Sequence, residues 1–323
     1  MIDPQPPRKN VLLLGATGTI GHATAQALVS AGHALTCLVR PGQSPDIPGA
    51  TIHAGDVTDP AVLTATFAEG GFDAVVSCLA SRTGAPTDAW KIDHQAHMDI
   101  LKTAGAAGVG QFVLLSAICV QKPDLAFQQA KLAFERALMA SSLTWSIVRP
   151  TAFFKSLSGQ IDRVREGKPF LLFGDGTLTA CKAISDRDLA TFIAICLTDA
   201  DKQNAVLPIG GPGPEITPLE QGELLFELLG QPARFRHVPV AMMSAIVGVL
   251  SAAGRLSPRL AAKAELARIG RYYATESMLV WDADSGCYDP DATPEFGTDT
   301  LRDHYTRVLA GEVTIDLGDH AVF

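Results

Sequence analysis

Short apolar runs alternate with longer segments along the first 150 residues of the chain. The short runs predict β-strands near residues 10–14, 34–39, 50–53, 73–78, 111–116 and 144–149. The longer segments predict helices near residues 19–31, 59–69, 88–108 and 124–140. Because the strands are apolar almost throughout, we expect helices to cover both faces of a parallel sheet. The pattern therefore predicts the α/β class, with a doubly wound parallel Rossmann sheet.

The first strand runs directly into a glycine pattern, G-x-x-G-x-x-G, which a helix follows. The first glycine permits a tight turn, the second lets the backbone approach a pyrophosphate, and the third lets helix and strand pack closely. The N–H groups at the start of the helix favour an anion. The cofactor-binding residues predicted here are Gly15, Thr17, Gly18, Thr19, Ile20 and Gly21.

Arg40, at the end of the second strand, favours NADPH over NADH. NAD-dependent proteins place an acidic residue there, whereas a guanidinium matches the extra phosphate of NADP. A solvated surface arginine is the alternative. Asp56 is predicted beside the adenine, and Asp59 is predicted to cap the next helix. Further cofactor contacts are predicted at Val57, Cys78, Leu79, Ala80, Lys131, Pro150 and Phe153.

The alternation of strands and helices loosens after Pro150. Helical patterns near 156–167 and 186–198 surround a glycine-rich stretch at 173–177, and AVLPIGG at 205–211 is strand-like. We expect an NADP-binding Rossmann domain over residues 1–155, to which residues 180–211 return. Residues 156–179 and 212–323 are expected to form a smaller, mostly helical substrate-binding region at the C-terminal side.

Composition narrows the class of protein further. Of the 323 residues 47% are hydrophobic, and the net charge is −8 without a basic run, which argues against disorder and against nucleic-acid binding. The six cysteines show no metal-ligand spacing; buried free thiols, a reducing cytoplasmic compartment and no metal site are expected. The polar, proline-rich first nine residues do not resemble a signal peptide.

The most apolar segment, residues 238–253, is shorter than a membrane span requires. We expect a buried helix there. An exposed helix that contacts an apolar ligand or a membrane surface is the alternative.

The reacting centre is predicted around Ser116, which ends the fifth strand, and Lys131. Short-chain dehydrogenase/reductases usually carry Tyr-x-x-x-Lys at the place where this chain has Phe127-Gln128-Gln129-Ala130-Lys131. The missing phenol is the usual proton donor to a carbonyl, so ordinary ketone reduction is not expected. Hydride could still reach a carbon–carbon double bond conjugated to a large electron sink.

Ser116 could then orient the substrate and Lys131 could hold the nicotinamide ribose. The alternatives are a polar strand end and an exposed helix lysine. Candidate proton donors, none of which is assigned, are His94, His97, Lys122, Tyr272 and Tyr273.

Several segments resemble the divinyl chlorophyllide 8-vinyl-reductase family. They are SRTGAPTDAWKIDHQA at 81–96, LLSAICVQKP at 114–123, FQQAKLAFE at 127–135, VRPTAFFKSLSGQ at 148–160 and ESMLVWDADSGCYDPDATPEFGTDTL at 276–301. These motifs are more specific than the glycine pattern. The family also has phenylalanine at the position of Phe127. This chain has His94 where the family has a tyrosine in IDYQA.

The resemblance implies an atypical short-chain dehydrogenase/reductase that uses NADPH to reduce the C8 vinyl group of 3,8-divinyl (proto)chlorophyllide a to ethyl. This step belongs to chlorophyll or bacteriochlorophyll biosynthesis. The start of the chain is not rich in arginine and serine as a plastid transit sequence would be, which favours a bacterial enzyme. A cytoplasmic location is expected, with peripheral contact to the photosynthetic membrane left open. A flat macrocycle needs an apolar cleft. Candidate substrate contacts are Phe153, Phe154, Trp281 and the methionines at 242–243 for the ring, and Lys155, Arg163 and Arg165 for the propionate.

Three alternatives remain open. They are an isoflavone-reductase-like enzyme with a smaller conjugated substrate, a non-catalytic NADP-sensing regulator of the NmrA type, and a complex-assembly protein that has lost its catalytic tyrosine. Retention of Lys131 and the resemblance itself weigh against the two non-catalytic alternatives.

Overall fold

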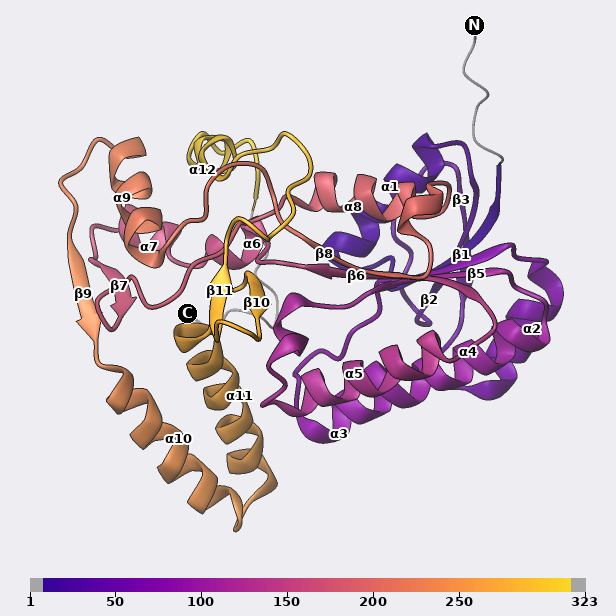
Figure 1. The fold of residues 1–323 in the computed structure, drawn as a ribbon, viewed down its shortest axis with the longest axis horizontal. Helices are drawn as coiled ribbons and strands as arrows, with labels where there is room; N and C mark the ends of the chain where they lie inside the picture. The colour runs from indigo at the N-terminus through magenta and orange to yellow at the C-terminus, as the bar shows by residue number, and fades with distance from the viewer. Residues whose placement is uncertain (1–7, 315–323) are drawn as a thin grey trace, which may run out of the picture.

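The computed structural model describes residues 8–314 and is built around a seven-stranded parallel sheet (Figure 1). The strand order is β3-β2-β1-β4-β5-β6-β8. The bounds are β1 Asn10–Leu14, β2 Ala34–Val39, β3 Ala50–Ala54, β4 Ala74–Ser77, β5 Gln111–Leu115, β6 Thr144–Pro150 and β8 Ala205–Ile209. The order reverses between β1 and β4, so the doubly wound Rossmann sheet is confirmed.

Helices cover both faces of the sheet, as its apolar strands require (Figure 1). α1 (Thr19–Ser30) and α8 (Asp186–Ile195) lie side by side on one face. α2 (Pro60–Gly70), α4 (His97–Ala106) and α5 (Ala126–Met139) lie on the other. Asp59 caps α2 as predicted, since its carboxylate accepts a hydrogen bond of 2.8 Å from the backbone N–H of Ala61.

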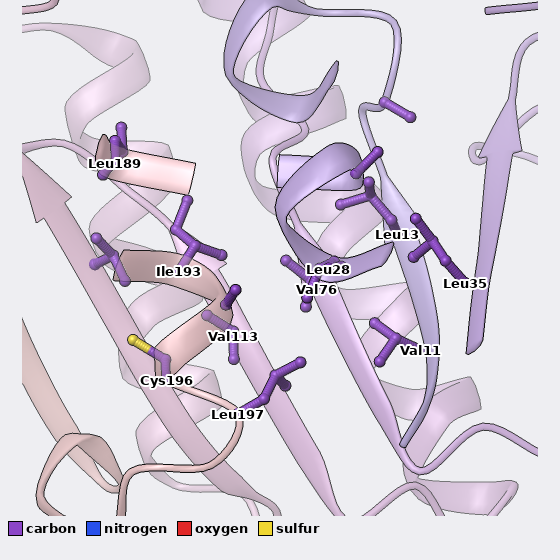
Figure 2. Close-up of a cluster of buried hydrophobic side chains, with 14 of the residues drawn as sticks. Val11, Leu13, Leu28, Leu35, Val76, Val113, Leu189, Ile193, Cys196 and Leu197 are labelled. Carbon is purple, nitrogen blue, oxygen red and sulfur yellow. The ribbon is translucent and has the colours of Figure 1, made fainter. Parts of the chain in front are cut away.

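Successive residues of β1 contribute to different cores, which explains its continuous apolar sequence. Val11 and Leu13 belong to the cluster beneath α1 and α8, together with Ile193 of α8 (Figure 2). Leu12 and Leu14 belong to the cluster on the other face. Both faces of the strand are therefore buried.

Two of the predicted helices are interrupted. The segment 88–108 is divided into α3 (Pro86–Ala89), a π-helix η1 (Trp90–Ala96) and α4. The segment 156–167 is divided into α6 (Phe154–Leu157) and α7 (Ile161–Arg165). Two short 3₁₀ helices are also present: η2 (Ile118–Gln121) follows β5, and η3 (Ala200–Lys202) precedes β8.

The later part of the chain builds a third hydrophobic cluster from α6, α7, α9 (Pro218–Leu228), α12 (Leu301–Leu309) and the strand pair β7–β9. β7 spans Phe170–Phe173 and β9 spans Phe235–Val238; β10 (Val280–Asp282) and β11 (Cys287–Asp289) form an antiparallel pair. β8 pairs with β6, so the chain returns to the seven-stranded sheet after β7 and before α9. The predicted residue limits of the two regions remain a prediction.

The expectation of a buried helix at 238–253 is wrong. α10 (Val240–Gly254) packs along α11 (Pro258–Thr275), and none of its residues is buried. The pair projects from the rest of the molecule (Figure 1). Within residues 8–314 no helix combines the length and the apolar character needed to cross a membrane.

The cysteines are all free thiols. Cys37, Cys119 and Cys196 are buried as expected, whereas Cys78 is half-buried. Over the described residues no cluster of three or more histidine, cysteine or acidic side chains could hold a metal ion.

Candidate functional site

The glycine loop between β1 and α1 is shaped by two close backbone contacts. Gly15 has φ of +82°, and a Cβ there would lie 2.6 Å from the carbonyl oxygen of Cys78. A Cβ on Gly21 would lie 2.0 Å from the carbonyl oxygen of Gly15. A Cβ on Gly18 would meet nothing nearer than 3.5 Å. The first and third glycines are thus required by the turn, whereas the second leaves space above the loop.

That space opens to the surface at the start of α1. Thr17, Gly18 and Thr19 are exposed, and no side chain caps the first turn of the helix. Ile20 is half-buried beside them. A hollow of about 470 Å³ borders the loop and is lined by Thr17, Gly18, Thr19, His22, Ala23, Gln26, Gln43, Ser44, Pro45 and Asp186. Uncapped N–H groups beside an open hollow can bind a phosphate.

Arg40 follows β2, and its side chain is exposed and makes no ion pair with any described residue. Asp56 accepts hydrogen bonds of 2.9 Å from both the backbone N–H and the hydroxyl of Thr58. These bonds, with smaller contributions from the charges of Lys91 and Arg40, lower the pKa of the Asp56 carboxyl. Val57 next to it is half-buried. An available guanidinium and an ionised carboxylate therefore lie close to each other at this end of the sheet.

The other predicted cofactor residues lie at the carboxyl ends of β4 and β6. Cys78 is half-buried with its thiol 3.6 Å from the hydroxyl of Thr24, and burial raises its pKa to about 12. Leu79 is half-buried and Ala80 is exposed. Pro150 is the last residue of β6 and is buried; Phe153, three residues later, is half-buried against the core under α1 and α8.

Lys131 is not a solvated helix lysine. Its ammonium lies 3.1 Å from a carboxylate oxygen of Asp93, and the two side chains are 12% and 0% exposed. The same oxygen accepts a hydrogen bond of 3.2 Å from the backbone N–H of Ser81. The second carboxylate oxygen is buried and has no protein partner. The pair joins α5 to the π-helix η1.

Asp93 was missed by sequence reasoning, although it lies within the segment 81–96 that carries the family resemblance. A lone acidic residue in an amphipathic pattern gives no sign that it is buried.

Ser116 belongs to a different buried group. Its hydroxyl donates a hydrogen bond of 2.5 Å to Glu135, which also accepts hydrogen bonds from the guanidinium of Arg149. Ser116 is 5% exposed and Glu135 is fully buried. In this arrangement the hydroxyl stabilises a buried carboxylate.

Phe127 occupies the position of the usual phenol with apolar neighbours. It is half-buried and packs in the cluster that contains Cys119, Tyr272 and Ile269 of α11. A Cβ on Gly84 would lie 3.5 Å from its ring. The position therefore has mainly apolar neighbours, and the Phe127 side chain itself has no hydroxyl.

Two of the candidate proton donors are held in the interior. His97 is buried, with Nδ1 2.9 Å from the carbonyl oxygen of Ile92 and Nε2 2.8 Å from the hydroxyl of Ser77. Burial, with a smaller effect of the Lys131 charge, lowers its pKa to about 4. The hydroxyl of Tyr272 lies 2.9 Å from the carbonyl oxygen of Cys119, and burial raises its pKa.

The remaining candidate donors are nearer the surface. Lys122 pairs with Glu276 at 2.5 Å and lies 4.5 Å from the centre of the Trp281 ring. His94 is half-buried against the ring of Trp90, and Tyr273 is 40% exposed.

Three of the predicted substrate contacts are engaged with other parts of the protein. Phe154 is 4% exposed and packs in the third hydrophobic cluster, so its assignment as a cleft wall is corrected. Lys155 donates a hydrogen bond of 3.0 Å to the hydroxyl of Thr19, which places its charge at the glycine loop. Arg163 is bound to the carbonyl oxygen of Pro169.

Two further predicted contacts are Trp281 and Arg165. Trp281 remains half-buried beside Lys122. Arg165 lies 3.5 Å from Asp162, one turn away.

Comparisons with known proteins agree with this geometry. A family model described as NAD(P)H-binding matches residues 15–200. The chain is 48% identical over 331 residues to the chloroplastic divinyl chlorophyllide a 8-vinyl-reductase of Zea mays, covering 97% of this chain and 82% of that protein. It is 47% identical over 319 residues to the protein of the same name from Arabidopsis thaliana, covering 93% and 76%.

A solved structure of similar fold is the NADPH-dependent quinone oxidoreductase of Escherichia coli complexed with NADPH. Its TM-score is 0.68 at 17% identity, and the match covers 93% of this chain and 99% of that one. At this identity the likeness concerns the fold alone.

The close approach at the glycine loop predicts a contrast between two substitutions. Gly21→Ala should lower the free energy of unfolding by about 1–3 kcal/mol, because its methyl group would overlap a backbone oxygen that cannot move freely. Gly18→Ala, the matched control in the same loop, should change it by less than about 0.5 kcal/mol. Urea unfolding followed by circular dichroism measures both. Equal stability of the two variants would show that the loop is not packed this tightly.

Proposed function

The chain belongs to the divinyl chlorophyllide a 8-vinyl-reductase family of NAD(P)H-binding proteins, and on that premise we propose that it is an NADPH-dependent reductase of 3,8-divinyl chlorophyllide a. The product carries an ethyl group in place of the C8 vinyl group. The observation that carries the proposal is 48% identity over 97% of the chain, together with the Lys131–Asp93 pair beside a phenylalanine in the phenol position. A cytoplasmic location with peripheral membrane contact is part of the proposal.

The residues of the glycine loop fit the cofactor. Gly18 leaves space for a pyrophosphate, and the uncapped first turn of α1 can donate N–H groups to it. Lys155, which reaches Thr19, adds a positive charge at the same place. Arg40 can pair with the phosphate that distinguishes NADP from NAD. When bound, NADPH supplies the hydride.

We assign Lys131 to the nicotinamide ribose and Asp93 to positioning Lys131. The carboxylate of Asp93 holds the ammonium group, and the N–H of Ser81 holds the carboxylate. A buried charge without a partner is costly, so each side chain restricts the other to one place. Lys131 is then already in one side-chain conformation from which it can donate hydrogen bonds to the ribose hydroxyls.

Phe127 indicates which bond is reduced. A carbonyl would need a proton at its oxygen as charge develops, and neither Phe127 nor the engaged hydroxyl of Ser116 offers one. A vinyl group on a conjugated macrocycle spreads that charge over the ring. The apolar neighbours of Phe127 suit a flat hydrocarbon surface, and Phe153 and Trp281 are retained as candidate contacts.

The second hydrogen does not come from His97. With its pKa lowered to about 4, His97 is neutral near pH 7, and its ring nitrogens are both engaged inside the protein. A proton from water is consistent with charge that is delocalised over the macrocycle.

The proposed activity can be measured directly. Purified protein with NADPH should convert divinyl chlorophyllide to the monovinyl form, seen as a blue shift of the Soret band. Folded protein that binds NADPH but produces no shift would contradict the proposed substrate and would favour a regulator or an assembly protein. Heat-denatured protein is the control.

Arg40→Ala should weaken binding of NADPH by about tenfold or more and leave binding of NADH nearly unchanged, because only NADPH carries the phosphate. Fluorescence titration of both nucleotides measures this difference. Lys102→Ala removes an equal charge from an exposed position on α4 and serves as the control. An equal loss for both nucleotides in Arg40→Ala would place Arg40 outside the phosphate site.

Asp93→Asn should lower kcat by about tenfold or more, equivalent to about 1.4 kcal/mol, because Lys131 loses the charge that holds it. Asp99→Asn, in the first turn of α4, removes a carboxylate that accepts a hydrogen bond from Gln95 and is the control. Reduced stability with an unchanged kcat would indicate a structural role alone.

A further inference from the structure

α10 is an apolar helix, one face of which is left uncovered by the rest of the described chain. Its 15 residues include no charged side chain, and none is buried. Met242, Ile246 and Val249 recur at helical spacing, and they are 49%, 46% and 69% exposed. An apolar stripe of this kind is normally buried inside a protein or covered by a binding partner.

The opposite side of α10 is covered by α11. Met243, Val247 and Leu250 form the half-buried stripe of α10, and a Cβ on Gly254 would lie 2.9 Å from the Cα of Ala261 on α11. The two helices therefore form a tightly packed hairpin, residues 240–275, here named the α10–α11 hairpin. Packing within the hairpin satisfies one face of α10 and leaves the other exposed.

The tip of the hairpin is its most exposed apolar point. Leu256, in the turn between the helices, is 89% exposed. Arg255 and Arg259 flank it, and both are exposed. The hairpin projects from the body of the protein with this turn at its free end (Figure 1). Because Leu256 and the two arginines lie at the free end of the hairpin, another surface can contact all three.

The charge of the hairpin is opposite to that of the whole chain. Residues 240–275 contain five basic residues and one acidic residue, a net charge of +4, whereas the chain has −8. The acidic residue, Glu265, is paired with Arg268 at 2.9 Å. Positive charge is thus concentrated in α11 and the turn of the hairpin that carries the exposed apolar stripe.

We propose that the α10–α11 hairpin docks on an anionic lipid surface. Val249 and Leu256 would enter the boundary between headgroups and acyl chains, and Arg255, Arg259 and Lys263 would contact the headgroups. α10 is about 22 Å long, shorter than a hydrocarbon core of about 30 Å, so it lies along the surface and does not cross the membrane. A second copy of the hairpin is a poorer partner because it would bring together two surfaces of the same charge.

The hairpin also reaches the candidate site. Ile269 of α11 packs with Phe127, and a Cβ on Gly84 would touch both side chains. Docking would therefore hold the apolar side of the site close to the membrane, from which an apolar ligand can arrive. The proposal itself needs no catalytic activity and can be tested separately from it.

The test is flotation of the full chain with vesicles. The protein should float with vesicles of phosphatidylcholine mixed with phosphatidylglycerol, and much less with phosphatidylcholine alone. Leu256→Glu should reduce flotation by about tenfold or more, and Arg255→Glu with Arg259→Glu should abolish the preference for anionic vesicles. Met139→Glu, at an exposed apolar position at the end of α5, is the matched control and should float like the unmodified protein.

NADPH titration of each variant shows that it is folded. Leu256→Glu should bind NADPH normally, so a failure of lipid binding is distinguishable from a failure of the proposed activity. The proposal is overturned if the unmodified protein floats with neither kind of vesicle, or if Leu256→Glu floats equally well. It is also overturned if Leu256 instead supports a dimer, seen by ultracentrifugation without lipid and lost in Leu256→Glu.

Discussion

The buried ion pair between Lys131 and Asp93 is the interaction on which the candidate site depends. It joins α5, which follows β5, to the π-helix η1, which follows β4, at the edge of the sheet where the glycine loop lies. Removing one partner would leave an uncompensated charge in the interior, so both side chains are held in place. The π-helix turn that carries Asp93 is a local irregularity of the kind often found at functional sites.

The polar groups around this pair explain the chemistry that we propose. Phe127 offers no proton, the hydroxyl of Ser116 is engaged with Glu135, and His97 is neutral and enclosed. These groups supply a held ammonium group and an apolar wall. A reaction in which the substrate itself delocalises the developing charge needs no proton donor fixed at an oxygen, and its proton can come from water, which fits reduction of a vinyl group on a macrocycle. The family resemblance inferred from the motifs is confirmed by the relatives at 46–48% identity.

Strand order, the glycine loop and the cap at Asp59 could be predicted because local patterns determine them: apolar strands, glycine spacing and a side chain beside its own helix. Asp93 could not, because its burial depends on the approach of two helices far apart in the sequence. The same limit applies to Phe154, which packs in a core built by later segments. Composition indicated that α10 needs an apolar partner, but only the fold shows that α11 covers just one side of it.

The central claim is that hydride is delivered to the vinyl group. It is tested most directly by single turnover with NADPH deuterated at the transferred position of nicotinamide C4, followed by mass spectrometry and NMR of the product. The account predicts one deuterium in the new C8 ethyl group, with the second hydrogen taken from solvent in a matching experiment in heavy water. Deuterium on a carbon that carried a ring carbonyl, or no deuterium in the product, would contradict it.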